Sequence, residues 1–265
     1  MYEFNYQRPG SLSEAVDAIK SADEGQALAG GQTLLPTLKQ RLANPSDLVD
    51  LAGIGELKGI SVDGGNVVIG AMTRHADVAA SAEIQARIPA LAALAGDIGD
   101  RQVRNRGTLG GSIANNDPAA DYPAACLALG ATITTSEQTF KAEDFFTGLF
   151  ETALGEGEIV TSVSFPAPDK AAYMKFKNPA SRYAIVGVFV AKSGSEVKVA
   201  VTGAGSGGVF RVPAMEDALA GDFSAAALEG ISVSPDELNS DIHAAADYRA
   251  HLIGVMARRA VEACG

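Results

Sequence analysis

The sequence predicts an α+β protein, and two observations support this prediction. In the first half of the chain, short β-branched runs alternate with segments whose apolar residues recur at helical spacing. After residue 169, three strand-like runs follow one another, and the segments after them have helical patterns. The 265 residues, 47% of them apolar, are enough for a substantial core and one or two domains.

The first helix is predicted over residues 12–21. Ser11 and Glu14 have the spacing of a capping box, and one helical face collects Leu12, Ala15, Val16 and Ile19. A strand-like run at 27–29 then leads through a glycine-rich turn to leucines at helical spacing, at positions 34, 35, 38 and 42, and to a second strand at 47–51. In such a unit the first N–H groups of the helix point into the turn, which suits a phosphate.

The remaining elements follow from simpler patterns. Residues 61–71 read as a hairpin around Gly64 and Gly65, and residues 77–95 are alanine-rich and helical. An apolar segment at 121–129 precedes a strand at 131–135, and two prolines mark a linker at 166–169. Beyond it we expect strands at 173–177, 184–191 and 197–202, then helices at 214–220, 224–229 and 244–263.

The most informative stretch is residues 108–121. Thr108-Leu109-Gly110-Gly111-Ser112 and the following Asn115 combine adjacent glycines with hydroxyl and carboxamide groups, and Asp121 ends the run. Glycine lets backbone N–H groups approach an anion, while Ser, Thr and Asn add hydrogen bonds. A phosphate or pyrophosphate is the natural ligand of such a loop. A tight turn without a ligand has a similar composition and stays an alternative.

Two glycine-rich loops, at 30–33 and 108–112, suggest one extended anionic ligand such as a dinucleotide. The formal net charge of −11 would repel nucleic acid and anionic lipid. A bound anion therefore needs backbone amides and local cations. Arg101, Arg104 and Arg106 could supply the cations, or they could pair with Asp97 and Asp100 at a solvated helix end.

Other site classes find little support. Gly203 to Gly208 matches G-x-G-x-x-G, but the extended, Pro-terminated segment that follows does not open the helix a Rossmann site needs. Cys126, Cys264 and three histidines cannot form an iron–sulfur cluster or a zinc ribbon, and no serine lies in a G-x-S-x-G elbow. No stretch is long enough for a membrane span, and the first residues lack signal-peptide character, so we expect a cytoplasmic protein.

The chain resembles the flavin-binding medium subunit of the molybdenum hydroxylases, the family of xanthine dehydrogenase and aerobic carbon monoxide dehydrogenase. The resemblance is strongest at 28–36, 102–114 and 117–124, and it continues at 175–188, 203–213, 248–249 and 258–260. It covers essentially the whole chain. It implies the two-subdomain FAD-binding fold of the vanillyl-alcohol oxidase and p-cresol methylhydroxylase type, with a small C-terminal domain of three-stranded antiparallel sheet and helix bundle.

The resemblance further implies two α/β FAD-binding subdomains at 1–54 and 55–168 and the C-terminal domain at 169–265. FAD would lie between the subdomains, and neither loop holds a Cys or His that could attach it, so we expect non-covalent binding. Gln32 is His in some family members and Ser112 is often Asn, so hydrogen bonds at these positions do not carry over. The implied cofactor-binding residues are Ala29, Gly30, Gly31, Gln32, Thr33, Leu34, Thr108, Leu109, Gly110, Gly111, Ser112, Asn115, Asp121 and Tyr183.

The implied role is electron transfer without a substrate-oxidising centre in this chain. In the family a molybdopterin large subunit oxidises the substrate, and a small subunit passes electrons through [2Fe–2S] clusters to the flavin. We therefore expect both subunits as partners, in a dimer of heterotrimers. The alternatives are a free-standing flavin or nicotinamide oxidoreductase with its own small substrate, and a scaffold without cofactor. NAD, quinone, a cytochrome and oxygen all stay open as the final acceptor.

Overall fold

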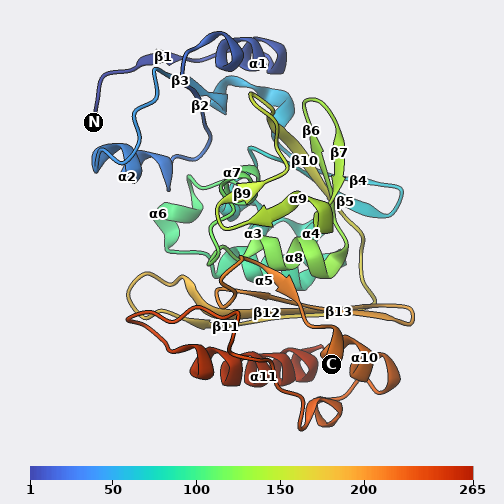
Figure 1. The fold of residues 1–265 in the computed structure, drawn as a ribbon. Coiled ribbons are helices and arrows are strands. Elements are labelled where there is room, and N and C mark those ends of the chain that lie inside the picture. Colours follow the sequence, from blue (N-terminus) through green and yellow to red (C-terminus); the bar gives the residue numbers. More distant parts are fainter. Residues whose placement is uncertain (265) are drawn as a thin grey trace.

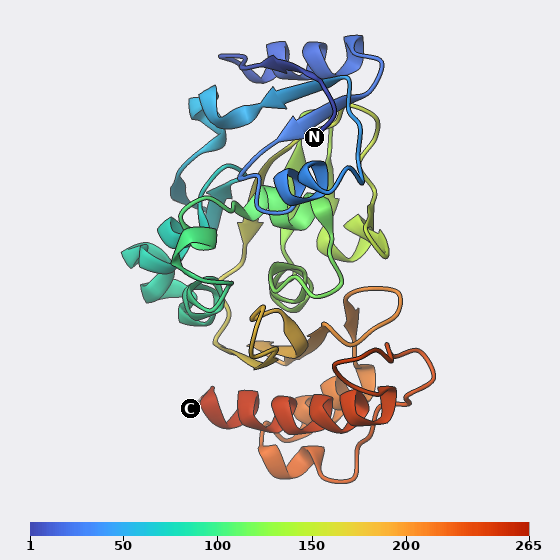
Figure 2. The same ribbon diagram turned by 90° about the vertical axis from the view of Figure 1, so that its left-hand side faces the viewer.

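The structure is a computed structural model that describes residues 1–264. Its N-terminal part is a small parallel sheet with the strand order β1-β3-β2. The strands are β1 (Asn5–Gln7), β2 (Gly25–Leu28) and β3 (Asp47–Asp50), with helices α1 (Leu12–Ser21) and α2 (Leu34–Lys39). Figures 1 and 2 show this unit, in blue, at the top of the molecule.

The helix predicted over 12–21 is confirmed as α1. The Ser11 side chain accepts the Glu14 N–H, and the Glu14 carboxylate accepts the N–H of Gly10 at 2.9 Å. Helix α2 begins as predicted at Leu34 and ends three residues before Leu42. Arg41 adopts a φ of 60°, which interrupts the helix and leaves Leu42 73% exposed.

The central part is built on a five-stranded antiparallel sheet with the order β4-β5-β10-β6-β7. The predicted hairpin is β4–β5, and Gly64 and Gly65 adopt the positive φ angles of its turn, 54° and 89°. The strands of this sheet are β4 (Ile60–Asp63), β5 (Asn66–Gly70), β6 (Thr132–Thr135), β7 (Thr139–Lys141) and β10 (Val160–Phe165).

The described central part also contains seven helices. The helical segment predicted at 77–95 is divided into three helices, because Ser81 caps the next helix through the N–H of Ile84 and Pro89 starts a third. The helices are α3 (His75–Ala80), α4 (Ala82–Arg87), α5 (Pro89–Gly96), α6 (Arg101–Arg104), α7 (Leu109–Asn115), α8 (Tyr122–Leu129) and α9 (Ala142–Phe145). Shorter elements are the 3₁₀ turns at Leu51–Gly53 and Gly55–Leu57 and the hairpin β8 (Phe146–Gly148) and β9 (Glu151–Thr152).

The glycine pair at 110–111, expected in a loop, lies in the first turn of α7. The Thr108 side chain caps this helix by accepting the Gly111 N–H, and Asn116 ends it in the left-handed conformation, with φ 41°. The asparagine side chain then donates to the carbonyls of Gly148 and Glu151, which ties the end of α7 to the β8–β9 hairpin.

The C-terminal part begins after the linker at 166–169, which has no regular structure. The three predicted strands form an antiparallel sheet, and the two-residue β14 adds a short fourth strand. Its elements are β11 (Lys170–Lys177), β12 (Ala184–Ser193), β13 (Glu196–Thr202), β14 (Phe210–Arg211), α10 (Pro213–Gly221), the 3₁₀ turn at Ala225–Leu228 and α11 (Ala246–Ala263).

Both faces of this C-terminal sheet are covered. In Figure 1, α5 and α8 lie on one side of the sheet and α10 and α11 on the other. Along β12, Phe189 and Ala191 belong to the core of the central part, while Val186, Val188 and Val190 belong to a separate core under α11. This explains why β12 is apolar without alternation. Within residues 1–264, no helix is both long and apolar enough to cross a membrane.

Candidate functional site

A cavity of about 590 Å³ lies where the three parts of the chain meet. Its size falls in the usual range for small-molecule and cofactor sites. The N-terminal part contributes the β2–α2 turn, the central part contributes α7 and its flanking segments, and the C-terminal part contributes residues 181–183. The cavity is therefore formed by segments that are distant in sequence.

The β2–α2 turn offers a row of free hydrogen-bond donors to this cavity. Within the described chain, none of the backbone N–H groups of residues 30–34 donates a hydrogen bond to another protein group. All five of these residues line the cavity. Consecutive unpaired amides form a concave site for an anion, and phosphate oxygens are suitable acceptors.

The two glycine-rich segments predicted to share a ligand lie against each other. A β-carbon at Gly30 would approach the Arg106 carbonyl oxygen closely and lie 2.7 Å from the Gly107 α-carbon. A β-carbon at Gly111 would lie 3.2 Å from the β-carbon of Ala29. Glycine at these positions therefore permits the close approach of the two backbones.

The glycine pair at 110–111 offers no free backbone amides to an anion, although the sequence predicts them. The N–H groups of Leu109, Gly110, Gly111 and Ser112 donate to Thr73 O, Ala71 O, Thr108 Oγ1 and Thr108 O at 2.8 to 3.2 Å. None of these four amides is left for a ligand. A β-carbon at Gly110 would lie 2.8 Å from the Ala71 carbonyl oxygen, so this glycine serves the packing of α7.

The side chains of α7 complete this wall. Ser112 and Asn115 line the cavity, and neither side chain has a hydrogen-bond partner within residues 1–264. Leu109 is fully buried in the core of the central part and does not line the cavity. Of the fourteen candidate residues, the other thirteen all belong to the cavity lining.

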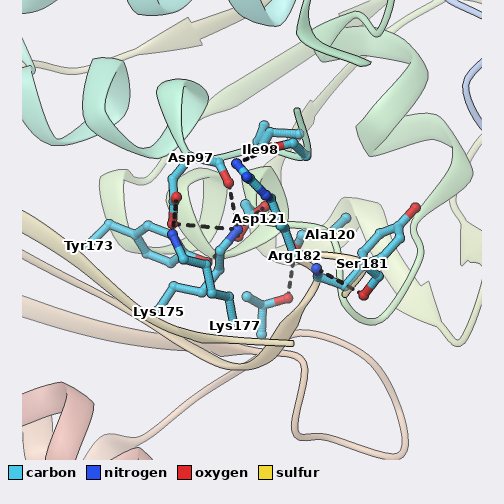
Figure 3. Close-up of polar contacts among 12 residues, drawn as sticks. Asp97, Ile98, Ala120, Asp121, Tyr173, Lys175, Lys177, Ser181 and Arg182 are labelled. Atoms are coloured by element: carbon cyan, nitrogen blue, oxygen red, sulfur yellow. Dashed lines mark hydrogen bonds and ion pairs between the residues drawn. The ribbon is translucent and has the colours of Figure 1, made fainter. Parts of the chain in front are cut away.

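Asp121 and Tyr183 lie at the part of the cavity next to the C-terminal sheet. The Asp121 carboxylate accepts hydrogen bonds from the Tyr173 hydroxyl and from Lys175 Nζ (Figure 3). Burial raises the pKa of Asp121, and Lys175 and Tyr173 oppose this rise. The half-exposed Tyr183 also has a raised pKa, because it is partly desolvated beside Asp117 and Asp121.

The three arginines before α7, at positions 101, 104 and 106, form no ion pair with Asp97 or Asp100. Arg104 donates to the carbonyl oxygens of Ile98 and Gly99, at 2.9 and 3.1 Å. Asp97 instead contacts Lys175 and Lys177, and the Asp100 carboxylate caps α6 by accepting the Val103 N–H. Arg101 and Arg106 are exposed and form no ion pair within the described part of the chain.

The cavity also contains two residues that were not among the predicted site residues. His75 lines it and is 5% exposed, and its Nδ1 has no hydrogen-bond partner in the structure. Burial, with a smaller effect of Arg104, lowers the pKa of His75 to about 4. No spacing pattern marks His75. Asp117 lines the cavity as well, and burial raises its pKa. Its place in the stretch 108–121 is the signal that could have identified it.

The G-x-G-x-x-G segment at 203–208 lies away from the cavity lining. It leads into β14 and then into α10, and no helix opens directly after Gly208. The Gly203 N–H donates to the Pro118 carbonyl oxygen, and the Thr202 hydroxyl donates to the carbonyls of Pro118 and Ala120. The segment thus fixes the loop before Asp121, in agreement with its exclusion as a Rossmann site.

The cavity with its row of free amides defines a protein that binds an anionic, extended cofactor. Residues 2–168 match the family model described as the FAD binding domain in molybdopterin dehydrogenase. This chain belongs to that family. FAD is accordingly its cofactor, and the protein is the FAD-binding part of an oxidoreductase, as the sequence indicated.

Individual relatives extend the match over the whole chain. The carbon monoxide dehydrogenase medium chain of Hydrogenophaga pseudoflava is 36% identical over 276 residues, 98% of this chain and 96% of the relative. The nicotine 6-hydroxylase medium subunit of Paenarthrobacter nicotinovorans is 35% identical over 275 residues, with the same coverage of 98% and 96%. A solved structure of the Hydrogenophaga pseudoflava carbon monoxide dehydrogenase has 36% identity and a TM-score of 0.87, with 99% and 97% of the two chains covered. These matches confirm the predicted fold class.

Proposed function

We propose that this chain is the electron-transferring medium subunit of a molybdenum hydroxylase. It would take electrons from [2Fe–2S] clusters of a partner subunit and pass them to an external acceptor. The observation that best supports this function is the row of unpaired amides at residues 30–34, because a cofactor with a pyrophosphate supplies the acceptors that these donors lack. Bound FAD supplies the chemistry of accepting and releasing one or two electrons.

The remaining candidate residues then have distinct parts in holding FAD. We assign the pyrophosphate to the segment from Ala29 to Leu34. The free Ser112 hydroxyl and Asn115 carboxamide on α7, with Thr108, Gly110 and Gly111 shaping the wall, would contact the ribityl and ribose hydroxyls. Asp121 and Tyr183 would lie beside the flavin ring. Leu109 would act from the core, by fixing the position of α7.

Partner subunits are part of the proposal because this chain has few groups that could hold a redox metal. Cys126 is buried in the core, where desolvation raises its pKa, and Cys264 lies at the end of the chain. The relatives are named as medium chains or medium subunits of larger enzymes. We therefore propose a complex with a [2Fe–2S] small subunit and a molybdopterin large subunit, doubled into a dimer of heterotrimers.

The oxidised substrate lies outside what this chain determines. Relatives named for carbon monoxide and for nicotine are 36% and 35% identical to it, so the two substrates are not distinguished by overall similarity. In the proposed complex the large subunit would select the substrate. The medium subunit would be common to enzymes with unrelated substrates.

The test uses the purified chain loaded with FAD under anaerobic conditions. We expect carbon monoxide, aldehydes and N-heterocycles to leave the flavin absorption bands unchanged, while dithionite bleaches them. Addition of the reduced small subunit should also bleach the bands. Bleaching by one of the substrates in the absence of other subunits would contradict the proposal and favour a free-standing flavin oxidoreductase.

A further inference from the structure

Lys175 is a buried cation behind the cavity wall. Its side chain is 1% exposed, and its Nζ lies 3.1 Å from Oδ1 and 3.2 Å from Oδ2 of Asp121. The same ammonium group donates to the backbone carbonyl of Asp97 at 3.0 Å. Asp121 lines the cavity, and so do Ile98 and Gly99, which follow Asp97. One side chain on β11 thus holds two separate segments of the wall (Figure 3).

Tyr173 lies two residues earlier on the same strand and donates its hydroxyl to Asp121 Oδ1. The space for this hydroxyl depends on a glycine in the neighbouring strand β12. A β-carbon at Gly187 would overlap the Tyr173 hydroxyl and lie 2.9 Å from the Thr202 side chain. The C-terminal sheet is therefore shaped to present a hydroxyl and an ammonium group to one buried carboxylate.

The groups around Asp121 have opposing effects on its charge. Burial favours the neutral acid, and the Asp97 carboxylate at the end of α5 acts in the same direction. Lys175 and Tyr173 on β11 favour the carboxylate form. The other charged or titratable groups nearby are Tyr122 and Asp117 in the segment of Asp121 itself, Arg182 and Tyr183 after β11, and Lys177, which pairs with Asp97. Lys175 is thus the one cation in direct contact with Asp121 among the described residues.

We propose that Lys175 and Tyr173 are positioning residues that keep Asp121 ionised and fixed in the cavity wall. Through them, the C-terminal sheet determines the state of the cavity at neutral pH. This inference rests on the proposed function, in which Asp121 faces bound FAD. An ionised carboxylate accepts stronger hydrogen bonds than a neutral acid, so a change in its protonation state would reach the cofactor.

The experiment compares the full-length wild-type chain with Tyr173→Phe, Lys175→Met and the double variant Lys175→Met/Asp121→Asn. NMR of isotope-labelled aspartate carboxyls follows the titration of Asp121 in the flavin-free chain, and the signal lost in Asp121→Asn assigns it. We expect the titration midpoint to rise by about one pH unit or more in Lys175→Met and by less in Tyr173→Phe. The Kd for FAD of Lys175→Met should be about tenfold higher at pH 6 than at pH 8. In the double variant this pH dependence should disappear.

An unchanged Asp121 midpoint in both single variants would overturn the proposal. So would a loss of FAD affinity in Lys175→Met that is equal at every pH, since this would indicate a purely structural role. Tyr173→Phe keeps the volume of the side chain. If Lys175→Met does not fold, the Asp121 titration midpoint in Tyr173→Phe tests the proposal. A wild-type chain that binds no FAD would contradict the proposed function, whereas the Asp121 titration would still test the positioning role.

Discussion

Gly30 and Arg106 bring two segments at the cofactor cavity, the β2–α2 turn and the segment before α7, into direct backbone contact. A β-carbon on Gly30 would run into the Arg106 carbonyl group, with its carbon 2.8 Å away. The β2–α2 turn with its free amides therefore rests on the segment that leads into α7. A substitution at position 30 should separate these walls.

We expect Gly30→Val to lose most of its bound FAD. The obstructing atoms belong to the backbone of Arg106 and Gly107, so a side-chain rearrangement cannot relieve the contact. Gly55→Val is the matched control, because a β-carbon at Gly55 has no heavy atom within 4 Å. Flavin content per chain, from absorption after purification, is the measurement. A Gly30→Val protein with full flavin content would refute the assignment of this turn.

FAD should be released completely when the protein is denatured with acid. No cysteine lines the cavity in the described structure, and the ring of its histidine, His75, is packed against Gly107. A β-carbon at Gly107 would lie 2.6 Å from His75 Nε2, so this nitrogen is covered by the chain. Trichloroacetic acid precipitation followed by absorption of the supernatant is the test. Yellow colour retained in the pellet would show covalent attachment.

The buried His75 should make the protein less stable in mild acid. Its pKa is about 4 in the folded chain, against an ordinary value of 6.5. Below pH 6.5 the unfolded chain binds a proton that the folded chain does not, so stability is lost as the pH falls from 6.5 towards 4. Between pH 8 and pH 5 the free energy of unfolding should fall by about 2 kcal/mol from this group.

His75→Gln should lack this part of the pH dependence. Urea unfolding of the flavin-free wild type and variant at both pH values measures the difference, because the carboxylates contribute equally to the two proteins. An identical change in unfolding free energy for wild type and variant would show that His75 is not the cause.

Arg249→Met should strongly destabilise the C-terminal part. The buried guanidinium donates to the carbonyls of Ile185 and Gly203 at 2.6 and 3.0 Å and to Asp241 at 2.7 Å. Its removal leaves the Ile185 and Gly203 carbonyls without this buried donor and Asp241 without its ion-pair partner, at a cost of about 3 kcal/mol. Arg259→Met, on the exposed side of the same helix, should change stability by less than about 0.5 kcal/mol. Equal unfolding midpoints in urea for the two variants would contradict this role.

The sequence predicted elements well where a local signal determines the structure. The capping box at Ser11 marked the start of α1, and the apolar run at 184–191 marked β12. The sequence predicted elements less well where packing between distant residues determines the structure. The glycines in the first turn of α7 indicated a loop, because glycine disfavours a helix. The helix is compatible with Gly110 because this residue packs against Ala71, which is distant in sequence.

The same distinction applies to the site. The glycine-rich composition pointed to the two segments that meet at Gly30 and Arg106, although the assignment of each residue to FAD stays a prediction. His75 was missed because nothing in its neighbourhood marks it. Lys175 did have a signal, since alternation along β11 places it on the same face as Tyr173, where an apolar core would exclude a cation.

Because helices pack on both faces of the C-terminal sheet, this sheet limits where the chain can be truncated. The family match ends at residue 168, within the proline-rich linker, which would be the obvious place to end a shorter chain. Yet Phe189 and Ala191 complete the central core, and Lys175 reaches into the cavity wall. A shortened chain would expose apolar helices and lose a wall of the cavity. We therefore expect the smallest stable FAD-binding fragment to extend beyond residues 2–168, which match the family model.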